Sequence, residues 1–320
     1  MNLQHIQSFF EHLAVDAAKR YVRSENITNE LKDDGTPVTK IDKGINAYVI
    51  EKIEKAFPGI PILSEEFKDR GDRLNSQYCF VVDPIDGTAA LKESKGISDL
   101  EEFVKFVDAN DFTLGRINSD QVSDAGYSID GVRALLLSRK FHNGNEVAAM
   151  KEFSERIREY SVLLGLAKYG RSVSGVCYMP ATGELYSASE GNGAVKIVDG
   201  SREIIQTSGE DENRIVIGRY NIDEDLIRIL AQEGRSLRDV QFGGSFGVKV
   251  CWVAEGRFDK YIHTNLDPNK KVHASLWDSC AVDVILSEAG GSSFDLKRKP
   301  IDYKSTSVPL TQGYIAIGKK

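Results

Sequence analysis

The chain has 320 residues, of which 41% are hydrophobic and 28% charged, a composition typical of a globular protein with one large domain or two joined ones. Its formal charge of -7 argues against binding to a nucleic acid polymer, which needs a basic face, although bound metal ions could make one site positive. The four cysteines form no C-x-x-C pair, and the N-terminus lacks a signal-peptide pattern. No apolar run approaches the roughly 20 residues of a membrane span. We therefore expect a soluble, cytoplasmic protein without a membrane anchor.

The first ninety or so residues combine helical and strand patterns. Apolar residues at helical spacing predict amphipathic helices over residues 3–22 and 41–57, separated by a turn at residues 32–37. Two short apolar runs follow, at residues 60–63 and 79–82, and each leads directly into acidic residues. Because α/β proteins usually carry functional carboxylates at the C-terminal ends of strands, we expect the site to be built here.

The middle of the chain has a different character. Helical patterns lie between polar, glycine-containing stretches, at residues 100–107, 132–137 and 147–157. They carry no catalytic spacing, and we interpret residues 92–159 as a helical insertion that could act as a lid.

Strand patterns return after the insertion, at residues 160–169, 172–178 and 184–188. After a polar bridge, strands and helices alternate from residue 214 to residue 317. This organisation predicts an α+β N-terminal domain, residues 1–91 and 160–206, and an α/β C-terminal domain, residues 207–320.

Four carboxylates are candidates for a metal site. Asp83 and Asp86 are three residues apart across a proline-initiated turn, with the Ile85 carbonyl between them. Glu65, after the preceding apolar run, and Asp278, at the start of a predicted helix, could join them. Mg²⁺ prefers such oxygen ligands, and this many carboxylates would repel one another unless cations bound between them. Each piece alone has an ordinary interpretation as a solvated turn or helix start, so the prediction depends on their combination.

The combination resembles a known superfamily. DPIDGT at residues 83–88, SEE at 64–66 and LWDSCAVDVILSEAGG at 276–291 look like the inositol monophosphatase superfamily of metal-dependent, lithium-sensitive phosphatases. The resemblance extends to DGTPVTKID at residues 34–42 and GVCYMPATGELYSASEGNGA at 175–194. It implies a layered αβαβα sugar-phosphatase fold, with the helical insertion added, and hydrolysis of a small phosphorylated metabolite with two or three Mg²⁺ ions. We expect a monomer or a homodimer.

The resemblance also implies roles for the metal ligands. Glu65, Asp83 and the Ile85 carbonyl would bind a first metal ion, and Asp83, Asp86 and Asp278 a second. No serine or cysteine nucleophile is needed for such a reaction, because a metal cluster can activate water directly.

Three further motif residues would act on the water and the phosphate. By resemblance, Asp42 and Glu65 would help place a third, more loosely held ion, and Thr88, oriented by Asp42, would polarise the attacking water. Backbone N–H groups at Gly87 and Thr88 could hold the phosphate oxygens.

The substrate contacts are predicted from two less regular matches. In GGSFGVKVCWVAEG, residues 243–256, Lys249 resembles the lysine of the S-x-x-K helix start of bisphosphate nucleotidases, although Phe246 stands where the serine is expected and Ser245 one place earlier. Residues 216–221 resemble the V-A-S-R-S-H stretch and keep Arg219, but Asn221 replaces the histidine.

We therefore expect Ser245, Lys249 and Arg219 to contact substrate, and predict a 3'(2'),5'-bisphosphate nucleotidase of the CysQ type acting on adenosine 3',5'-bisphosphate or a related metabolite. The alternatives are an inositol monophosphatase or other sugar phosphatase, and a protein that binds a phosphorylated metabolite without hydrolysing it. A group of basic residues is interpreted as an exposed loop, namely His263, Lys270, Lys271 and His273.

Overall fold

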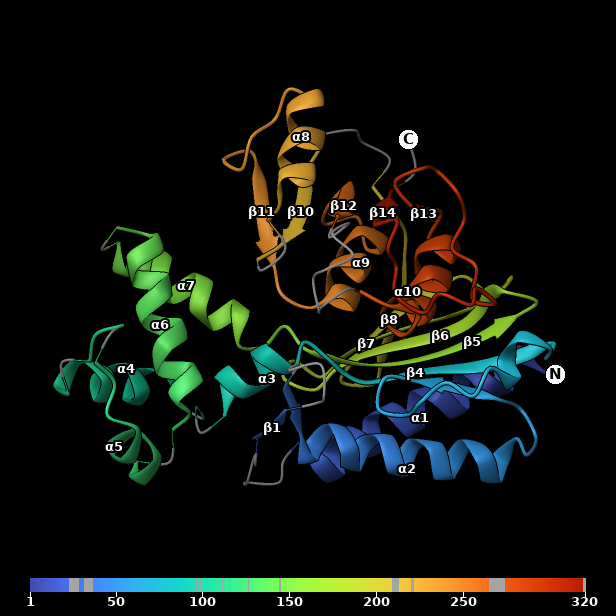
Figure 1. Ribbon diagram of the computed structural model, residues 1–320, viewed down its shortest axis with the longest axis horizontal. Helices are drawn as coiled ribbons and strands as arrows, with labels where there is room; N and C mark the ends of the chain where they lie inside the picture. The colour runs from blue at the N-terminus through green and yellow to red at the C-terminus, as the bar shows by residue number, and fades with distance from the viewer. Residues whose placement is uncertain are drawn as a thin grey trace.

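The fold is a stack of helical layers and two large sheets in the computed structural model (Figure 1). The structure describes residues 1–22, 29–31, 37–95, 97, 99–110, 112–114, 116–125, 127–143, 145–208, 213–219, 222–264 and 274–318. Within these ranges all four cysteines are buried and free, as expected from their apolar neighbours. No helix in the same ranges is long and apolar enough to cross a membrane.

The larger sheet has seven strands and carries helices on both faces. Its neighbouring strands are antiparallel, except that β3 and β4 are parallel. In spatial order the strands are β3 (Ile62–Ser64), β4 (Tyr78–Asp86), β5 (Ser161–Lys168), β6 (Arg171–Met179), β7 (Glu184–Ser189), β8 (Ala194–Val198) and β9 (Ser201–Ile205). The first face is covered by α1 (Leu3–Tyr21) and α2 (Lys40–Ala56) (Figure 1). A two-stranded ribbon, β1 (Asn29–Leu31) with β2 (Pro37–Thr39), precedes α2, and a 3₁₀ turn spans Asp72–Leu74.

Strand β4 is apolar from Cys79 to Val82, where both of its faces are buried. Phe80 and Val82 pack into the core beneath α1 and α2, whereas Cys79 and Val81 belong to the core on the opposite face. Alternate residues of a strand point to opposite faces, so a strand between two helical layers needs apolar residues at every position.

The second sheet has five strands and completes the layered order. Strand β10 is parallel to β11 and β12, while β14 is antiparallel to β12 and β13. In spatial order the strands are β11 (Val240–Gly243), β10 (Ile215–Gly218), β12 (Lys260–His263), β14 (Tyr314–Ile317) and β13 (Ser292–Phe294).

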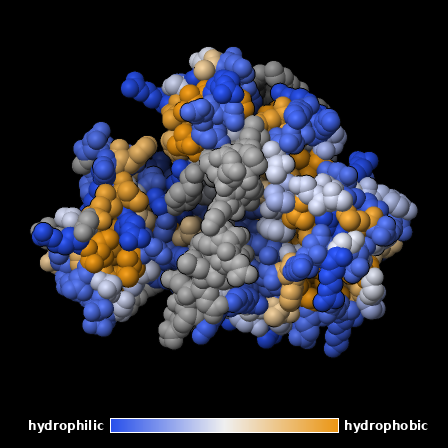
Figure 2. Space-filling model, in the orientation of Figure 1, coloured by the Kyte–Doolittle hydropathy of each residue, from blue (hydrophilic) through white to orange (hydrophobic). Residues whose placement is uncertain are grey.

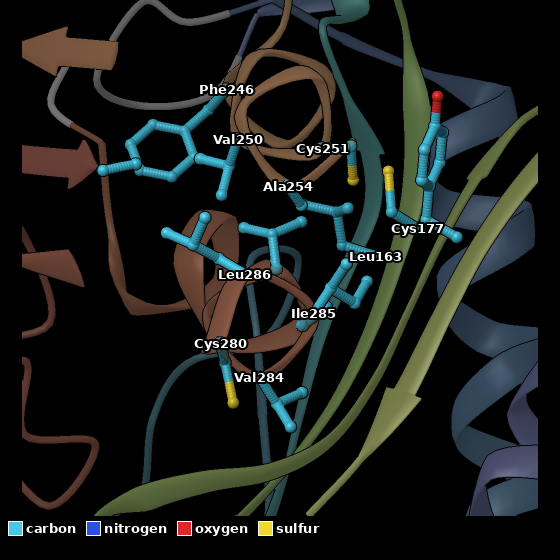
Figure 3. Packing of buried hydrophobic residues seen from close by; sticks show 14 of the residues in the cluster. Leu163, Cys177, Phe246, Val250, Cys251, Ala254, Cys280, Val284, Ile285 and Leu286 are labelled. Carbon is cyan, nitrogen blue, oxygen red and sulfur yellow. The ribbon is translucent and has the colours of Figure 1, made fainter. Parts of the chain in front are cut away.

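Helices α9 (Phe246–Ala254) and α10 (Leu276–Glu288) pack in the core that joins the two sheets, and the packing of both helices against β5 and β6 is visible in Figure 3. On the far side, α8 (Glu224–Gln232) packs on β10 and β11 through Leu226 and Leu230. The predicted αβαβα fold is confirmed by this arrangement.

A helical segment projects to one side of these layers (Figure 1). It comprises α3 (Thr88–Ser94), α4 (Leu100–Ala109), α5 (Ser119–Asp124), α6 (Ile129–Phe141) and α7 (Glu146–Arg156). Its core is a separate cluster built around Phe103, Val132, Leu135 and Phe153. Apolar side chains also gather on its surface at the left of Figure 2, and Phe141 and Val147 are 66% and 83% exposed.

The longer elements were predicted correctly and the shorter ones were missed. Helices α1 and α2 lie within one residue of their predicted bounds, and α8, α9 and α10 lie where strands and helices were predicted to alternate. The elements not predicted are β1, β2, α3, α5, β8, β9, β11 and β13. They have three to seven residues each, too few to show a period, and β9 in addition is mostly exposed and lacks alternation. Most of the predicted turn at residues 32–37 lies outside the described residues.

Candidate active site

The end of β4 contains a β-bulge that brings two carboxylates together. Asp83 pairs with Leu163 and Asp86 with Ser161, so three steps along β4 correspond to two along β5. In a regular strand, residues three apart point to opposite faces, and one extra residue places them on the same side. The predicted turn at Asp83–Asp86 is therefore wrong: these residues belong to the strand, and Pro84 is accommodated in the bulge, where no ladder hydrogen bond is required of it.

Asp278 completes a three-carboxylate cluster from another element. One oxygen each of Asp83, Asp86 and Asp278 lies within 4.8 Å of the others. Asp278 stands in the first turn of α10, where the Ser275 backbone N–H donates to its Oδ2 at 2.7 Å and fixes its rotamer. Glu65, which directly follows β3, is not one of these three.

The cluster is electrostatically unfavourable without a cation. Burial raises the pKa of Asp83 well above its usual range, and the nearby charges of Glu65, Asp278 and Asp86 raise it further. Burial also raises the pKa of Asp278, together with the charges of Asp86 and Glu65. Asp83 is 2% exposed, and its Oδ1 has no hydrogen-bond partner among the described residues. A buried, unbonded carboxylate oxygen among like charges is a ligand set that fits a hard divalent cation.

Asp86 also holds the N-terminus of α9. Its carboxylate accepts hydrogen bonds from the backbone N–H groups of Phe246 at 3.0 Å and Gly247 at 2.6 Å, and from Ser161 Oγ at 3.2 Å. A carboxylate at the N-terminus of a helix accepts hydrogen bonds from unpaired N–H groups and interacts favourably with the positive end of the helix dipole. The sequence does not reveal the contact between Asp86 and α9, because Asp86 and Phe246 are 160 positions apart.

Thr88 and Asp42 are hydrogen-bonded, in the arrangement expected from the resemblance. Thr88 Oγ1 donates to Asp42 Oδ1 at 2.9 Å and also lies 3.2 Å from the Ile85 carbonyl oxygen. Asp42 is held in turn by Thr39, whose backbone N–H donates to its Oδ2 at 2.9 Å in a capping box. The Thr88 proton is thus committed to a protein acceptor, and its oxygen can accept a hydrogen bond from water.

Only glycine fits at position 87. Its φ is +93°, and a Cβ there would lie 2.8 Å from the Ser245 Cβ and 2.9 Å from the Glu159 carbonyl oxygen. The turn that leads into Thr88 therefore depends on Gly87 both for its backbone conformation and for space.

A cavity of about 230 Å³ opens beside the cluster. Among the predicted site residues, its lining includes Asp86, Gly87, Arg219, Ser245, Lys249 and Asp278. Asp42, Glu65, Asp83, Ile85 and Thr88 do not line it. The lining of the cavity therefore contains both acidic candidates for metal ligands and basic side chains.

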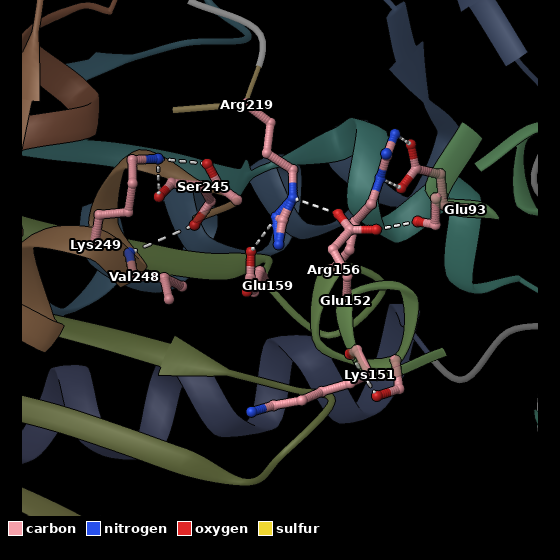
Figure 4. A network of polar contacts seen from close by, with 12 residues as sticks. Glu93, Lys151, Glu152, Arg156, Glu159, Arg219, Ser245, Val248 and Lys249 are labelled. Carbon is pink, nitrogen blue, oxygen red and sulfur yellow. Dashed lines mark hydrogen bonds and ion pairs between the residues drawn. The ribbon is translucent and has the colours of Figure 1, made fainter. Parts of the chain in front are cut away.

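Lys249 is a buried cation in the wall of this cavity. Its Nζ donates to the carbonyl oxygens of Ser245, at 2.6 Å, and Gly244 (Figure 4). The same Nζ lies 4.9 Å from the centre of the Tyr261 ring. Burial lowers the pKa of Lys249 to about 8, although the charges of Asp86 and Glu159 oppose that shift. The lysine is not the surface residue that a position on a helix alone would suggest.

Arg219 lies between two carboxylates. Its Nε donates to Glu152 Oε1 at 3.0 Å, and its Nη1 is 3.5 Å from Glu159 Oε2 (Figure 4). Burial raises the pKa of Glu159, while Arg219 and Lys249 favour its charged form.

Several cavity residues were not predicted. Arg156 and Glu159 line it, although sequence patterns indicated no functional residue between positions 92 and 159. His263 was interpreted as part of an exposed loop, and that interpretation is wrong, because it ends β12, is buried and lines the cavity. Four other singled-out residues lie outside the described ranges, namely Asn221, Lys270, Lys271 and His273.

Comparisons with known proteins agree with this geometry. The chain matches the family model described as "Inositol monophosphatase family" over residues 3–90 and 150–316. It is 26% identical over 284 residues to the 3'(2'),5'-bisphosphate nucleotidase CysQ of Escherichia coli strain K12, covering 88% of this chain and 86% of that protein. It is also 28% identical over 276 residues to a bifunctional NADP phosphatase/NAD kinase of Methanocaldococcus jannaschii, covering 85% of this chain and 40% of that protein.

Among solved structures, CysQ from Bacteroides thetaiotaomicron has the same fold. Its TM-score is 0.64 at 19% identity, covering 99% of this chain and 98% of that one. The family match covers far more than half of the residues and contains the strand, turn and helix that carry the carboxylate cluster. The chain therefore belongs to the inositol monophosphatase family and is a phosphatase.

Proposed function

We propose that the protein is a Mg²⁺-dependent phosphomonoesterase, and specifically a 3'(2'),5'-bisphosphate nucleotidase that releases phosphate from adenosine 3',5'-bisphosphate or a related small metabolite. The observation that carries the proposal is the juxtaposition, around one cavity, of the carboxylate cluster and the buried Lys249. The first suits metal-assisted phosphate chemistry, and the second suits a substrate with an additional anionic group.

The metal ions would be held by residues on three elements. Glu65, Asp83 and the Ile85 carbonyl would form one site, and Asp83, Asp86 and Asp278 a second. The unbonded Asp83 Oδ1 supports a bridging role for this residue. When bound, Mg²⁺ supplies positive charge to the phosphate oxygens and lowers the pKa of water.

The protein's own groups would orient the nucleophile. Thr88 Oγ1, whose proton is directed to Asp42 or the Ile85 carbonyl, can accept a hydrogen bond from the attacking water and so aim its lone pair at phosphorus. Gly87 allows the chain to pass close to Ser245, so that the backbone N–H groups that follow can face a phosphate.

Lys249 and the relatives together favour a bisphosphate substrate. A buried ammonium group in the cavity wall can bind a second phosphate as a charge-assisted donor. The Escherichia coli relative is a 3'(2'),5'-bisphosphate nucleotidase by name, which supports the same substrate class here.

One observation favours the alternative, a phosphatase for inositol or sugar monophosphates. Arg219 is already bound by Glu152 and Glu159, so fewer of its donors can face a second phosphate. Carboxylates at that end of the cavity would suit the hydroxyl groups of a polyol equally well.

A substrate panel tests the proposal. Phosphate release would be measured with Mg²⁺ for adenosine 3',5'-bisphosphate, inositol 1-phosphate and p-nitrophenyl phosphate, with Mg²⁺ omitted as the control. We expect the bisphosphate to have the highest kcat/KM and Thr88→Val to lower kcat for all three substrates. A preference for inositol 1-phosphate would select the alternative, and no release from any of them would contradict the proposed function.

A further inference from the structure

Helix α7 presents two ion-pairing residues on one face. Glu152 and Arg156 are four residues apart and therefore lie on the same side of the helix. Glu152 accepts from Arg219, which follows β10, at 3.0 Å, and Arg156 donates twice at 2.6 Å to Glu93 of α3 (Figure 4). One turn of α7 thus connects the five-stranded sheet to the helix that follows the catalytic turn.

The helical segment is attached to the five-stranded sheet by side-chain contacts and not through a shared core. Its hydrophobic cluster contains no buried residue of either large sheet among those that the structure describes. Its contacts with the sheet include the Glu152–Arg219 pair and an edge-on contact of Phe141 with Phe242 of β11, with ring centres 6.0 Å apart. Helices α4 to α7, whose large buried apolar residues lie in this separate cluster, can therefore shift relative to the sheet without exposing the main cores.

The cavity is small for the substrate that its chemistry indicates. It measures about 230 Å³, whereas pockets for small-molecule ligands typically measure roughly 300–1,000 Å³. Arg156 of α7 forms part of its wall. Because Arg156 belongs to α7, withdrawal of this helix would enlarge the cavity on this side.

Arg219 is the point at which a substrate can act on α7. Its guanidinium group already binds carboxylate oxygens, and a phosphate group presents oxygens that suit the same donors. A substrate with a second anionic group can therefore replace Glu152 without creating a new kind of contact. A leaving group without an anionic oxygen cannot replace Glu152, because it offers Arg219 no charge-assisted acceptor.

We propose that the second anionic group of the substrate competes with Glu152 for Arg219, which makes the Glu152–Arg219 pair a latch on the cavity and Glu152 a specificity-determining residue. This inference rests on the proposed function, because it assigns a partner to the non-scissile part of the substrate. It gives the helical segment a defined role in the choice of substrate.

Steady-state kinetics of Glu152→Gln test the latch. Glutamine keeps the shape of the side chain but removes the competing charge, so KM for adenosine 3',5'-bisphosphate should fall about three- to tenfold, the ratio that a net hydrogen-bond free energy implies. KM for p-nitrophenyl phosphate, which has only the scissile phosphate, should not change. Glu155→Gln is the matched control, since Glu155 is exposed on the same helix.

A double-variant comparison separates competition from a structural effect. Arg219→Gln should raise KM for the bisphosphate about ten- to a hundredfold, and adding Glu152→Gln to it should change nothing further. Thermal melting checks that each variant is folded. If Glu152→Gln does not fold, Glu152→Asp, which withdraws the carboxylate from Arg219 but keeps its charge, should lower KM in the same direction.

The outcomes distinguish the latch from the proposed function. An unchanged or higher KM for the bisphosphate in Glu152→Gln overturns the latch and leaves the nucleotidase proposal standing. If wild type hydrolyses p-nitrophenyl phosphate but not the bisphosphate, the nucleotidase proposal fails, and the Ki of the bisphosphate as an inhibitor replaces KM in the same comparison. No activity on any phosphate ester would overturn the proposed function and the latch with it.

Discussion

Replacing Asp83 by asparagine should abolish turnover and, at the same time, stabilise the metal-free protein. Asp83 is buried beside three other carboxylates, and its pKa is raised well above the usual range by burial and by their charges. Above the ordinary carboxyl pKa, the folded state without metal must either hold these charges together or take up a proton. Both costs fall on the folded state alone, and asparagine removes them.

The size of the effect follows from the geometry of the cluster. Two unit charges 4.8 Å apart, the upper limit for these oxygens, interact by roughly 3.5 kcal/mol at an effective dielectric constant of about 20. Asp83 has two such neighbours in the cluster, but proton uptake relieves part of the repulsion. We therefore expect the metal-free variant to be more stable than wild type by about 2–4 kcal/mol, a rise in Tm of roughly 3–6 °C for a chain of this length.

Thermal melting with and without Mg²⁺ measures this directly. Wild type should be stabilised by Mg²⁺, by about 2.7 kcal/mol when the ion is at a hundred times its Kd, and Asp83→Asn should respond much less. Asp124→Asn is the control, because it is the same change at an exposed position on α5. Turnover should fall by more than the roughly 10²–10⁴-fold that removal of a general base produces.

Two results would refute this reasoning. One is an Asp83→Asn protein that melts below wild type without Mg²⁺, which would mean that the carboxylate stabilises the fold by itself. The other is an equal response of both proteins to Mg²⁺, which would place the metal elsewhere.

Three further predictions concern the substrate, the metal sites and pH. Lys249→Ala should lower kcat/KM for adenosine 3',5'-bisphosphate by about ten- to a hundredfold and change kcat/KM for inositol 1-phosphate little. An equal loss of kcat/KM for both substrates would assign the lysine to the scissile phosphate. Li⁺ should inhibit phosphate release, because it takes oxygen ligands with half the charge of Mg²⁺, and full activity at high Li⁺ would contradict the assignment of the second metal site.

Burial raises the pKa of Asp283 to about 6 from 3.8, despite hydrogen bonds from the Tyr303 and Tyr314 hydroxyl groups. A carboxyl group whose pKa is raised by folding stabilises the folded state most at low pH. Between about pH 4 and pH 7 the free energy of unfolding of wild type, measured with urea, should therefore fall by about 2–3 kcal/mol relative to that of Asp283→Asn. Free energies of unfolding that change in parallel with pH in the two proteins would contradict this prediction.

The sequence predicted the layers and the position of the site, because both depend on local patterns. Helices such as α1 and α9 have a clear period or apolar composition, and the carboxylates lie in motifs that can be recognised without a structure. The metal and substrate roles of these residues, and the division into domains at residues 92–159 and 207–320, remain predictions.

Contacts between distant parts of the chain could not be predicted. The bulge in β4 depends on its register with β5, which is set some 75 residues later. The approach of Glu152 to Arg219 depends on how the helical segment is placed beside the second sheet, and no local pattern encodes that placement.

The bulge in β4 makes the chemistry of this protein sensitive to residue count as well as residue type. A deletion of Pro84 or Ile85 would let β4 and β5 pair regularly, so the strand and its buried core could survive. Asp83 and Asp86 would then be two apart and would still share one face of the strand, but one of the two backbone units between them would be gone. The extra residue thus adds a backbone oxygen beside the two carboxylates, the Ile85 carbonyl that Thr88 Oγ1 contacts at 3.2 Å, and a single lost codon would leave a folded strand in which the carboxylates remain but this backbone site is altered.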